Sequence, residues 1–264
     1  MPDYETIAVE RHGRVEVIRF NRPEAMNSFN PTMTREWVDA LEAADSDPDV
    51  GVIVSTGTGR AYSAGADMGG FARRQEAGGP DPASQAAPPR RGAFDPHYLA
   101  ACKPIIGAIN GVAITGGFEV ALACDVLICS EHARFADTHA RVGITPGWGL
   151  SQKLSRAIGP YRAKELSLTG NFLDAKTAYD WGLVNRVVPA AELMPTALKL
   201  AAEMASIEAD MLVTYKAMID DGYALAMGEG LELEHSRSLA HNAAVTPEMV
   251  ADRRAAVQAR GRSQ

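Results

Sequence analysis

The sequence predicts an α/β fold in which mostly parallel strands alternate with helices. Three observations support this prediction. Short apolar runs typical of buried strands recur along the first half of the chain, and helical patterns follow them. From residue 195 onward the pattern is helical, with breaks at glycine and proline. We therefore expect an α/β core over residues 1–190 and a helical C-terminal region over residues 191–264.

The first elements are predicted from residue type and spacing. Residues 15–20 alternate between apolar and polar side chains and end at an Asn-Arg-Pro turn, as a strand does. Asn30 and Pro31 then mark the start of a helix, as the N-cap and the first helical position. The apolar residues of this helix recur at helical spacing: Met33, Trp37, Val38 and Leu41.

The remaining elements follow the same logic. Strands are expected where apolar runs of four to six residues stand between turn signals, and helices where longer periodic segments occur. Residues 78–92 consist mainly of Gly, Pro, Ala and Ser, and this loop is too long for a simple connector, so the 71–93 segment is a candidate lid. The expected elements are strands at 50–54, 104–109, 125–129 and 183–188, a turn and helix at 111–124, and helices over 150–180 broken at 159–160 and 169–171.

Composition narrows the class of protein. The 264 residues are 46% hydrophobic and 22% charged, as in an ordinary globular protein. No apolar run approaches the roughly 18 residues of a membrane helix, and the N-terminus lacks a signal-peptide pattern. The three cysteines have neither metal-ligand nor CxxC spacing, and Cys124 and Cys129 lie in apolar sequence. We expect reduced, buried thiols and a cytoplasmic protein.

The charge of the chain argues against a nucleic-acid partner. The formal net charge is −7, and the isoelectric point is near 5.4, whereas a phosphate backbone requires a basic surface. Two groups of arginines nevertheless stand out, either as solvated surface residues or as contacts for a ligand's phosphates. They are Arg73, Arg74, Arg90 and Arg91 in one loop, and Arg253, Arg254, Arg260 and Arg262 near the C-terminus.

The segment from Thr115 to Glu119 is a candidate reactive site. It follows a buried strand and begins a helix, with Thr115 as N-cap or first-turn residue. The free N–H groups and dipole of a helix N-terminus favour negative charge, and Gly116 and Gly117 have no Cβ to block a ligand. Glu119 lies about one turn further on. It either complements the helix dipole or acts as an acid/base group, and its apolar neighbours favour the second interpretation.

A second loop, residues 63–67, is a weak signal by itself. Paired with the first, it offers backbone N–H donors from two places beside a carboxylate. Two such donors converging on one oxygen, with an acid/base group adjacent, suit enolate chemistry on a thioester.

The order of several motifs resembles the crotonase, or enoyl-CoA hydratase/isomerase, superfamily. The resemblance runs from about Thr6 to about Arg260. The matching segments are Asn21-Arg22-Pro23-Glu24-Ala25-Met26-Asn27-Ser28, Ser63-Ala64-Gly65-Ala66-Asp67, Lys103-Pro104-Ile105-Ile106-Gly107-Ala108-Ile109-Asn110-Gly111, Gly116 to Asp125, Leu168-Thr169-Gly170, and Ala178 to Asn185.

The resemblance implies a fold and a set of site residues. The fold is a spiral of repeated ββα turns, with a helical C-terminal part that builds homotrimers, commonly paired into hexamers. The N–H groups of Ala66 and Gly116 match the oxyanion hole, and Glu119 matches the first of two catalytic glutamates. The positions that match coenzyme A contacts are Ala61, Ser63, Ala64, Ala66, Asp67 and Gly116.

The chain departs from the hydratase pattern at the second glutamate, where it has His139. Imidazole titrates near neutrality and can take the missing catalytic role, or His139 is a structural residue. Asp137 is a nearby substitute that need not reach the same ligand atom. Trp148 either narrows the acyl site or packs in the core, and core packing is favoured. Thr115 stands where the family usually has glycine or alanine, and Gly107 where alanine is usual; both look tolerable.

The resemblance implies an enoyl-CoA hydratase-like lyase with no metal and no separate cofactor, because coenzyme A is part of the substrate. Loss of the second glutamate makes a pure isomerase less suitable. Two alternatives stay open: another lyase reaction through the same enolate on a branched or aromatic acyl-CoA, and an acyl-CoA-binding protein with weak catalysis.

Overall fold

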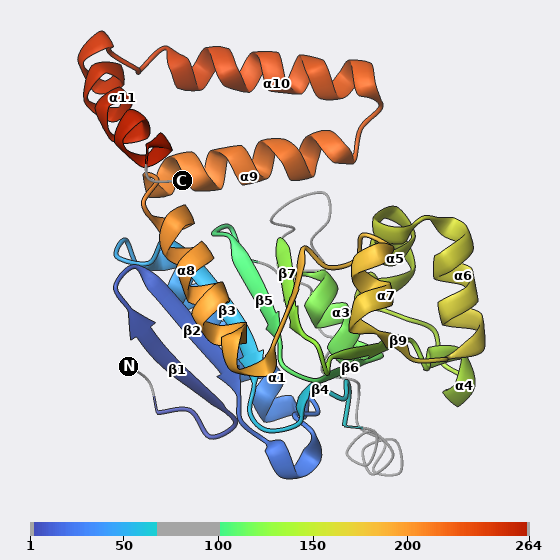
Figure 1. Cartoon of the computed structure of the whole chain (residues 1–264). Coiled ribbons are helices and arrows are strands. Elements are labelled where there is room, and N and C mark those ends of the chain that lie inside the picture. Colours follow the sequence, from blue (N-terminus) through green and yellow to red (C-terminus); the bar gives the residue numbers. More distant parts are fainter. Residues whose placement is uncertain (1–2, 68–100, 263–264) are drawn as a thin grey trace. The chain divides into compact units, whose positions relative to one another are not determined.

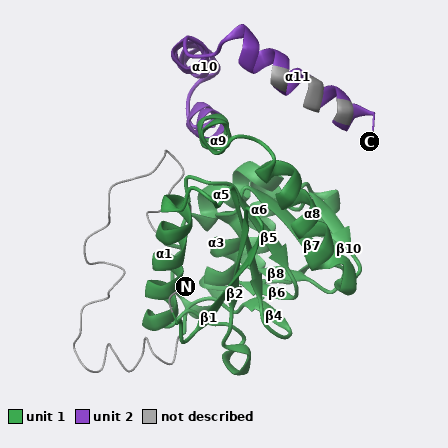
Figure 2. Ribbon diagram, turned by 90° about the vertical axis from the view of Figure 1, so that its left-hand side faces the viewer, with its two compact units in different colours: residues 1–216 green, residues 217–264 purple. Residues whose placement is uncertain are grey.

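The structure, a computed structural model, describes residues 3–67 and 101–262. The predicted lid and the arginines at 73, 74, 90 and 91 lie outside the described residues. The chain divides into two compact units, residues 1–216 and 217–264 (Figure 2).

The first unit is built on a six-stranded sheet (Figure 1). Its strand order is β1-β2-β3-β5-β7-β10; β1 runs antiparallel to β2, and every later neighbour pair is parallel. The prediction of a mostly parallel sheet is therefore confirmed. The strands are β1 Ile7–His12, β2 Val15–Phe20, β3 Val52–Gly57, β5 Ile105–Ile109, β7 Val126–Ser130 and β10 Arg186–Val188.

A smaller four-stranded sheet has the order β4-β6-β8-β9. The consecutive strand pairs β3–β4, β5–β6 and β7–β8 each place their first strand in the large sheet and their second in the small one. This repeated division is the ββα spiral that the resemblance implied. The strands are β4 Ala61–Ser63, β6 Val112–Ile114, β8 Arg134–Ala136 and β9 Leu173–Asp174.

Helices follow the strands and form the whole C-terminal part. The predicted start of α1 is confirmed: Asn30 Oδ1 accepts the Met33 N–H at 2.8 Å, and Pro31 is the first helical residue. Among the described residues, the α-helices are α1 Pro31–Ser46, α3 Gly116–Leu122, α4 His139–Val142, α5 Leu150–Ile158, α6 Pro160–Thr169, α7 Ala175–Asp180, α8 Leu193–Ala205, α9 Ala209–Tyr223, α10 Met227–Asn242 and α11 Pro247–Gly261; the short 3₁₀ helices are η1 Pro23–Ala25 and η3 Ala190–Glu192. None of the helices in the described ranges is both long and apolar enough to cross a bilayer.

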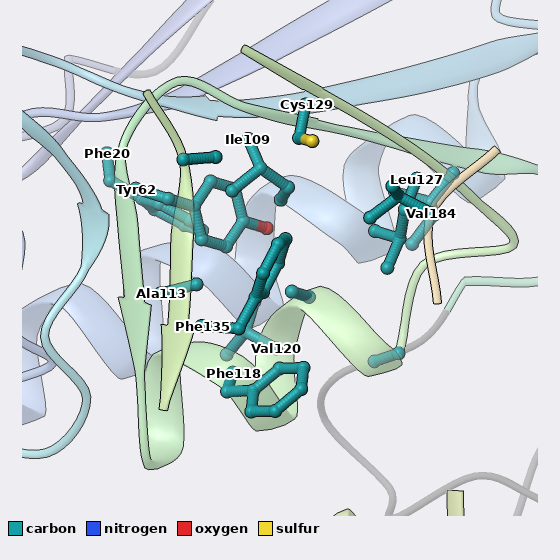
Figure 3. Close-up of a cluster of buried hydrophobic side chains, with 14 of the residues drawn as sticks. Phe20, Tyr62, Ile109, Ala113, Phe118, Val120, Leu127, Cys129, Phe135 and Val184 are labelled. Atoms are coloured by element: carbon teal, nitrogen blue, oxygen red, sulfur yellow. The ribbon is translucent and has the colours of Figure 1, made fainter. Parts of the chain in front are cut away.

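The two faces of the large sheet carry separate cores because side chains alternate along each strand. On β2, Ile18 and Phe20 face a large cluster that includes residues of α1 and α3 and the small sheet, whereas Val15 and Val17 face α8. Figure 3 shows the large cluster, in which the rings of Phe20 and Tyr62 lie 5.2 Å apart. This cluster fixes the ends of the strands from which the site residues follow.

Helix α8 belongs to the first unit rather than to a separate helical region. Its small buried residues, including Ala197 and Ala201, pack against the sheet. The two units divide between Lys216 and Ala217, within α9, whereas the expected boundary was at residue 190. Within the second unit, Arg237 donates to the Asp221 carboxylate at 2.6 Å.

The three cysteines are free thiols. Cys129 is buried, as predicted, whereas Cys124 is only half-buried and packs against the large core cluster. Its thiol lies 3.5 Å from the Ser55 hydroxyl.

Candidate active site

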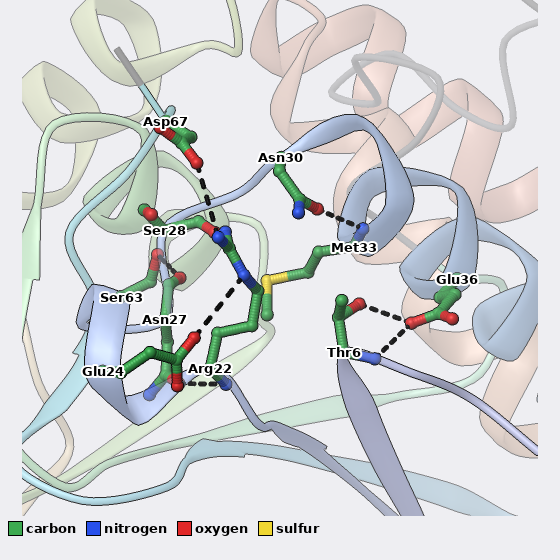
Figure 4. Close-up of polar contacts among 10 residues, drawn as sticks. All are labelled: Thr6, Arg22, Glu24, Asn27, Ser28, Asn30, Met33, Glu36, Ser63 and Asp67. Atoms are coloured by element: carbon green, nitrogen blue, oxygen red, sulfur yellow. Dashed lines mark hydrogen bonds and ion pairs between the residues drawn. The ribbon is translucent and has the colours of Figure 1, made fainter. Parts of the chain in front are cut away.

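The loop after β4 is held by the turn that follows β2 (Figure 4). The Ser63 hydroxyl donates to the Asn27 carbonyl at 2.8 Å. Arg22, at the exit of β2, forms an ion pair with Asp67 at 3.4 Å. Asn27 is fully buried and its backbone has a φ of 54°, in the left-handed region. Residues 63–67 are therefore fastened at both ends.

The backbone N–H of Ala66 takes no part in the hydrogen bonds that join this loop to Phe29. An isolated bridge joins Phe29 to Ala66, but its bonds run from Phe29 N to Gly65 O at 2.7 Å and from Asp67 N to Phe29 O at 3.0 Å. The bridge uses the groups on either side of Ala66 and not its own N–H. Ala66 is also exposed, so its amide is available to a ligand.

The second amide comes from the start of α3. Gly116 is the first residue of that helix, so its N–H precedes the first bond within the helix. Thr115 stands at the N-cap position, but its side chain makes no capping bond; its hydroxyl bonds the Thr138 hydroxyl at 2.5 Å. The φ of Thr115 is 54°, a costly value for a β-branched residue. The backbone before Gly116 is therefore held in an unusual conformation.

The two amides lie close enough to share one oxygen. A Cβ built on Gly116 would be 3.2 Å from the Ala66 nitrogen. Because a Cβ is about 2.5 Å from its own nitrogen, the two amide nitrogens are at most about 5.7 Å apart. Two N–H···O bonds of about 2.9 Å to a single oxygen can span that separation. At Gly117 a Cβ would meet the Ser63 carbonyl at 2.1 Å, so only glycine permits this approach of the two loops.

Glu119 is buried beside this pair, with only 2% of its surface exposed. Its Oε1 accepts two backbone N–H bonds, from Trp148 at 2.8 Å and from Leu150 at 3.2 Å. These bonds orient the carboxyl group and place its other oxygen, Oε2, 3.6 Å from His139 Nε2. This orientation favours the interpretation of Glu119 as an acid/base group over the interpretation that it only complements the helix dipole.

His139 lies between two carboxyl groups. Its Nδ1 is 2.7 Å from Asp137 Oδ1, on the opposite side of the ring from Glu119. Only 5% of His139 and 3% of Asp137 are exposed. Glu119, His139 and Asp137 thus form a buried row, which sequence reasoning did not foresee because it treated Asp137 as a separate substitute.

The environment shifts the two carboxyl groups in opposite directions. Burial raises the pKa of Glu119, and this effect outweighs the N–H bonds from Trp148 and Leu150. Burial also acts to raise the pKa of Asp137, but hydrogen bonds from the His139 ring, from Ser167 and from the His139 backbone bring it below its usual value. Asp137 is therefore the ionised end of the row, and Glu119 is the end at which a proton is more easily held.

Trp148 serves this site in two ways. Its backbone N–H orients Glu119. Its half-buried ring packs against the core and lies 6.2 Å from the Phe29 ring, and a Cβ at Gly116 would touch the indole at 3.1 Å. The favoured core packing is thus present, and the ring also borders Gly116.

The other predicted positions are distributed as follows. Ala61 and Ser63 are buried in β4, and Ala64 is half-buried in the loop beyond it. At Gly107, a Cβ would lie 2.7 Å from the end of the Leu127 side chain, so a larger residue would require that side chain to shift. No group of three or more His, Cys, Asp and Glu side chains in residues 3–67 and 101–262 is arranged to hold a metal ion. The C-terminal arginines lie on and just beyond α11, and their role toward phosphates stays a prediction.

Comparisons with known proteins agree with this geometry. The family model described as enoyl-CoA hydratase/isomerase matches residues 10–246. The chain is 42% identical to a probable peroxisomal enoyl-CoA hydratase 1 of Arabidopsis thaliana over 238 residues, covering 89% of this chain and 86% of that one. It is 35% identical to 2,3-dehydroadipyl-CoA hydratase of Escherichia coli over 228 residues, covering 86% and 87%.

Solved structures show the same likeness. A probable enoyl-CoA hydratase/isomerase from Mycobacterium abscessus matches with a TM-score of 0.82 at 28% identity, covering 96% of each chain. An enoyl-CoA hydratase from Mycobacterium tuberculosis matches with a TM-score of 0.71 at 35% identity, covering 90% of this chain and 94% of that one. The chain belongs to the enoyl-CoA hydratase/isomerase family.

Proposed function

We propose that the protein is an enoyl-CoA hydratase-like lyase, which adds water to an α,β-unsaturated acyl-CoA thioester or eliminates it. One observation carries the proposal: a buried carboxyl, oriented by the Trp148 and Leu150 amides, lies next to a helix start whose amide can share an oxygen with that of Ala66. A site that stabilises an enolate and also moves a proton needs both features. The relatives named as hydratases support the same reaction.

In the proposed reaction the thioester carbonyl oxygen lies between the N–H groups of Ala66 and Gly116. Glu119 accepts a proton from water as the water oxygen bonds to the β-carbon, and the carbonyl becomes an enolate. The α-carbon then takes a proton from His139 or from the same carboxyl, which restores the carbonyl. The product is a 3-hydroxyacyl-CoA, and the reverse sequence eliminates water.

His139 takes the role that a second carboxylate has in the hydratase pattern. Its Nε2 lies 3.6 Å from Glu119 Oε2, so the two groups can serve neighbouring atoms of one substrate. An imidazole exchanges protons near neutral pH, as this role requires. The same replacement favours, as the second candidate, another lyase reaction through this enolate on a branched or aromatic acyl-CoA.

The proposal extends to partners and compartment. The substrate brings coenzyme A, and the chemistry requires no metal ion or redox cofactor. We propose a homotrimer or a hexamer of two trimers, by family resemblance, and a cytoplasmic location, by the spacing of the cysteines. Relatives named as peroxisomal and mitochondrial exist, so fractionation of the source cell is the test of the location. Light scattering coupled to size-exclusion chromatography is the test of the assembly.

Turnover of crotonyl-CoA, followed by loss of the conjugated thioester absorbance, tests the reaction. We expect rapid loss with the wild type and a fall in kcat of about a hundredfold or more in Glu119→Gln, since a positioned acid/base group contributes that much. Glu165→Gln, which changes an exposed carboxyl on α6, should match the wild type. The hydratase proposal fails if the wild type leaves short, long, branched and aromatic enoyl-CoAs unchanged. The role of Glu119 fails if Glu119→Gln keeps full activity.

A further inference from the structure

We propose that Asp137 is a positioning residue that acts through His139, so that an aspartate–imidazole pair replaces the second carboxylate of the hydratase pattern. This inference rests on the proposed function and deepens it. Asp137 itself contacts no reacting atom. It holds the ring so that Nδ1 carries a proton and Nε2 is directed at the carboxyl group of Glu119.

The contacts of the His139 ring determine which nitrogen carries the proton and which one can accept a proton. Asp137 Oδ1 is 2.7 Å from His139 Nδ1 and also accepts the His139 backbone N–H at 3.2 Å. An ionised carboxylate can only accept hydrogen bonds, so the proton in the ring contact belongs to Nδ1. When the ring is neutral, Nε2 is then unprotonated, and it can take a proton from the direction of Glu119, 3.6 Å away.

Charge determines where a mobile proton lies. Two carboxyl groups contact the ring from opposite sides, whereas the nearby Arg141 donates its Nε to the Thr169 carbonyl at 2.7 Å. The fixed negative charge of Asp137 stabilises an imidazolium. A proton that Glu119 has taken from water can pass to His139 Nε2, 3.6 Å away, and from there to the α-carbon.

A purely structural role for Asp137 is the competing explanation, because its bond to the His139 backbone N–H also supports the start of α4. Asp137→Asn separates the two roles: it keeps an oxygen that can accept the backbone bond and removes the charge. Asp174→Asn is a matched control. Asp174 caps α7 by accepting the Thr177 N–H at 2.9 Å, and the same substitution there removes a charge from a helix start outside the row.

The kinetic test measures crotonyl-CoA turnover against pH. We expect Asp137→Asn to lower kcat about a hundredfold while KM changes by less than about threefold. The pH profile of kcat/KM should also change, because the carboxylate charge beside the imidazole has been removed. Asp174→Asn should match the wild type in both respects. Unchanged kcat and an unchanged pH profile in Asp137→Asn would overturn the proposal.

A second readout does not depend on turnover. A proton resonance from His139 Nδ1–H, shifted downfield by its hydrogen bond to Asp137, should be visible in the wild type and in Asp174→Asn. It should be missing in His139→Gln, which assigns it, and lost or moved upfield in Asp137→Asn. If the wild type has no enoyl-CoA activity, the hydratase proposal fails while this spectrum still decides the ring's proton. If the ring lacks a proton at Nδ1, the role of Asp137 is wrong even where hydration is observed.

Discussion

Replacing Gly116 with alanine tests whether the Gly116 amide forms part of the oxyanion hole. The added Cβ would lie 3.1 Å from the Trp148 ring and 3.2 Å from the Ala66 nitrogen. Both distances are tighter than ordinary van der Waals contact, so the ring and the Ala66 loop must each give by a few tenths of an ångström. The methyl group therefore spreads the two amides that are proposed to hold one oxygen.

The expected cost falls on catalysis rather than on folding. Crowding a packed site costs on the order of 1–3 kcal/mol, whereas alanine in place of glycine in a helix gains up to about 1 kcal/mol. The φ of Gly116 is not in the left-handed region, so alanine can adopt this backbone. Losing one oxyanion donor costs about 2.7–4 kcal/mol in the transition state, or about 10²–10³ in kcat.

The assay compares kcat for crotonyl-CoA with the midpoint of thermal unfolding. We expect Gly116→Ala to lose about a hundredfold or more in kcat and only a few degrees in Tm. Gly147→Ala is the matched control, since a Cβ there meets nothing within 4 Å. A folded Gly116→Ala enzyme with kcat within about threefold of the wild type would refute the assignment of this amide to the oxyanion hole.

Three further variants test the surroundings of the site. Because burial raises the pKa of Glu119, the wild type should lose stability as pH rises from the ordinary carboxyl pKa to the raised value. Glu119→Gln has no such loss, so the urea concentration at its unfolding midpoint should equal or exceed that of the wild type above this interval. A lower midpoint for Glu119→Gln at every pH would contradict the reasoning. Trp148→Ala keeps the backbone N–H bond to Glu119 but removes the ring beside Gly116. The ratio of kcat/KM for branched to that for linear enoyl-CoA should then rise about tenfold. An unchanged ratio would show that the ring does not limit the size of the acyl group. Asn27→Ala removes three hydrogen bonds of 2.8–2.9 Å to backbone groups, one from an N–H and two to carbonyls. Asn110 still donates to one of these carbonyls, that of Ala61, at 3.2 Å. The other two groups lose their side-chain partner, which should cost about 2 kcal/mol or more in the free energy of unfolding, a loss that urea denaturation will detect or exclude.

Local signals in the sequence were enough to predict five strands of the large sheet and part of the candidate site. They did not predict the small sheet, whose strand β6 lies where a turn before a helix was expected, because its strands are only two or three residues long. Alternating or continuous apolar runs specify the strands, because a strand's side chains point to opposite faces whatever surrounds it. The Asn30-Pro31 pair specifies the start of α1 in the same way, since a cap bonds only the next few residues. Gly116 and Glu119 were found for a related reason: a helix N-terminus carries its free amides and dipole with it.

The tertiary structure alone decided which distant groups meet. Glu119 is oriented by the amides of Trp148 and Leu150, and His139 is set between Glu119 and Asp137, yet no residue pattern announces these contacts. They depend on how successive turns of the spiral stack and on the register of β6 against β8. A shift of one residue in that register would turn side chains to the opposite face of the sheet. The residue types could therefore be predicted from the sequence, whereas their arrangement in one buried row was determined by packing.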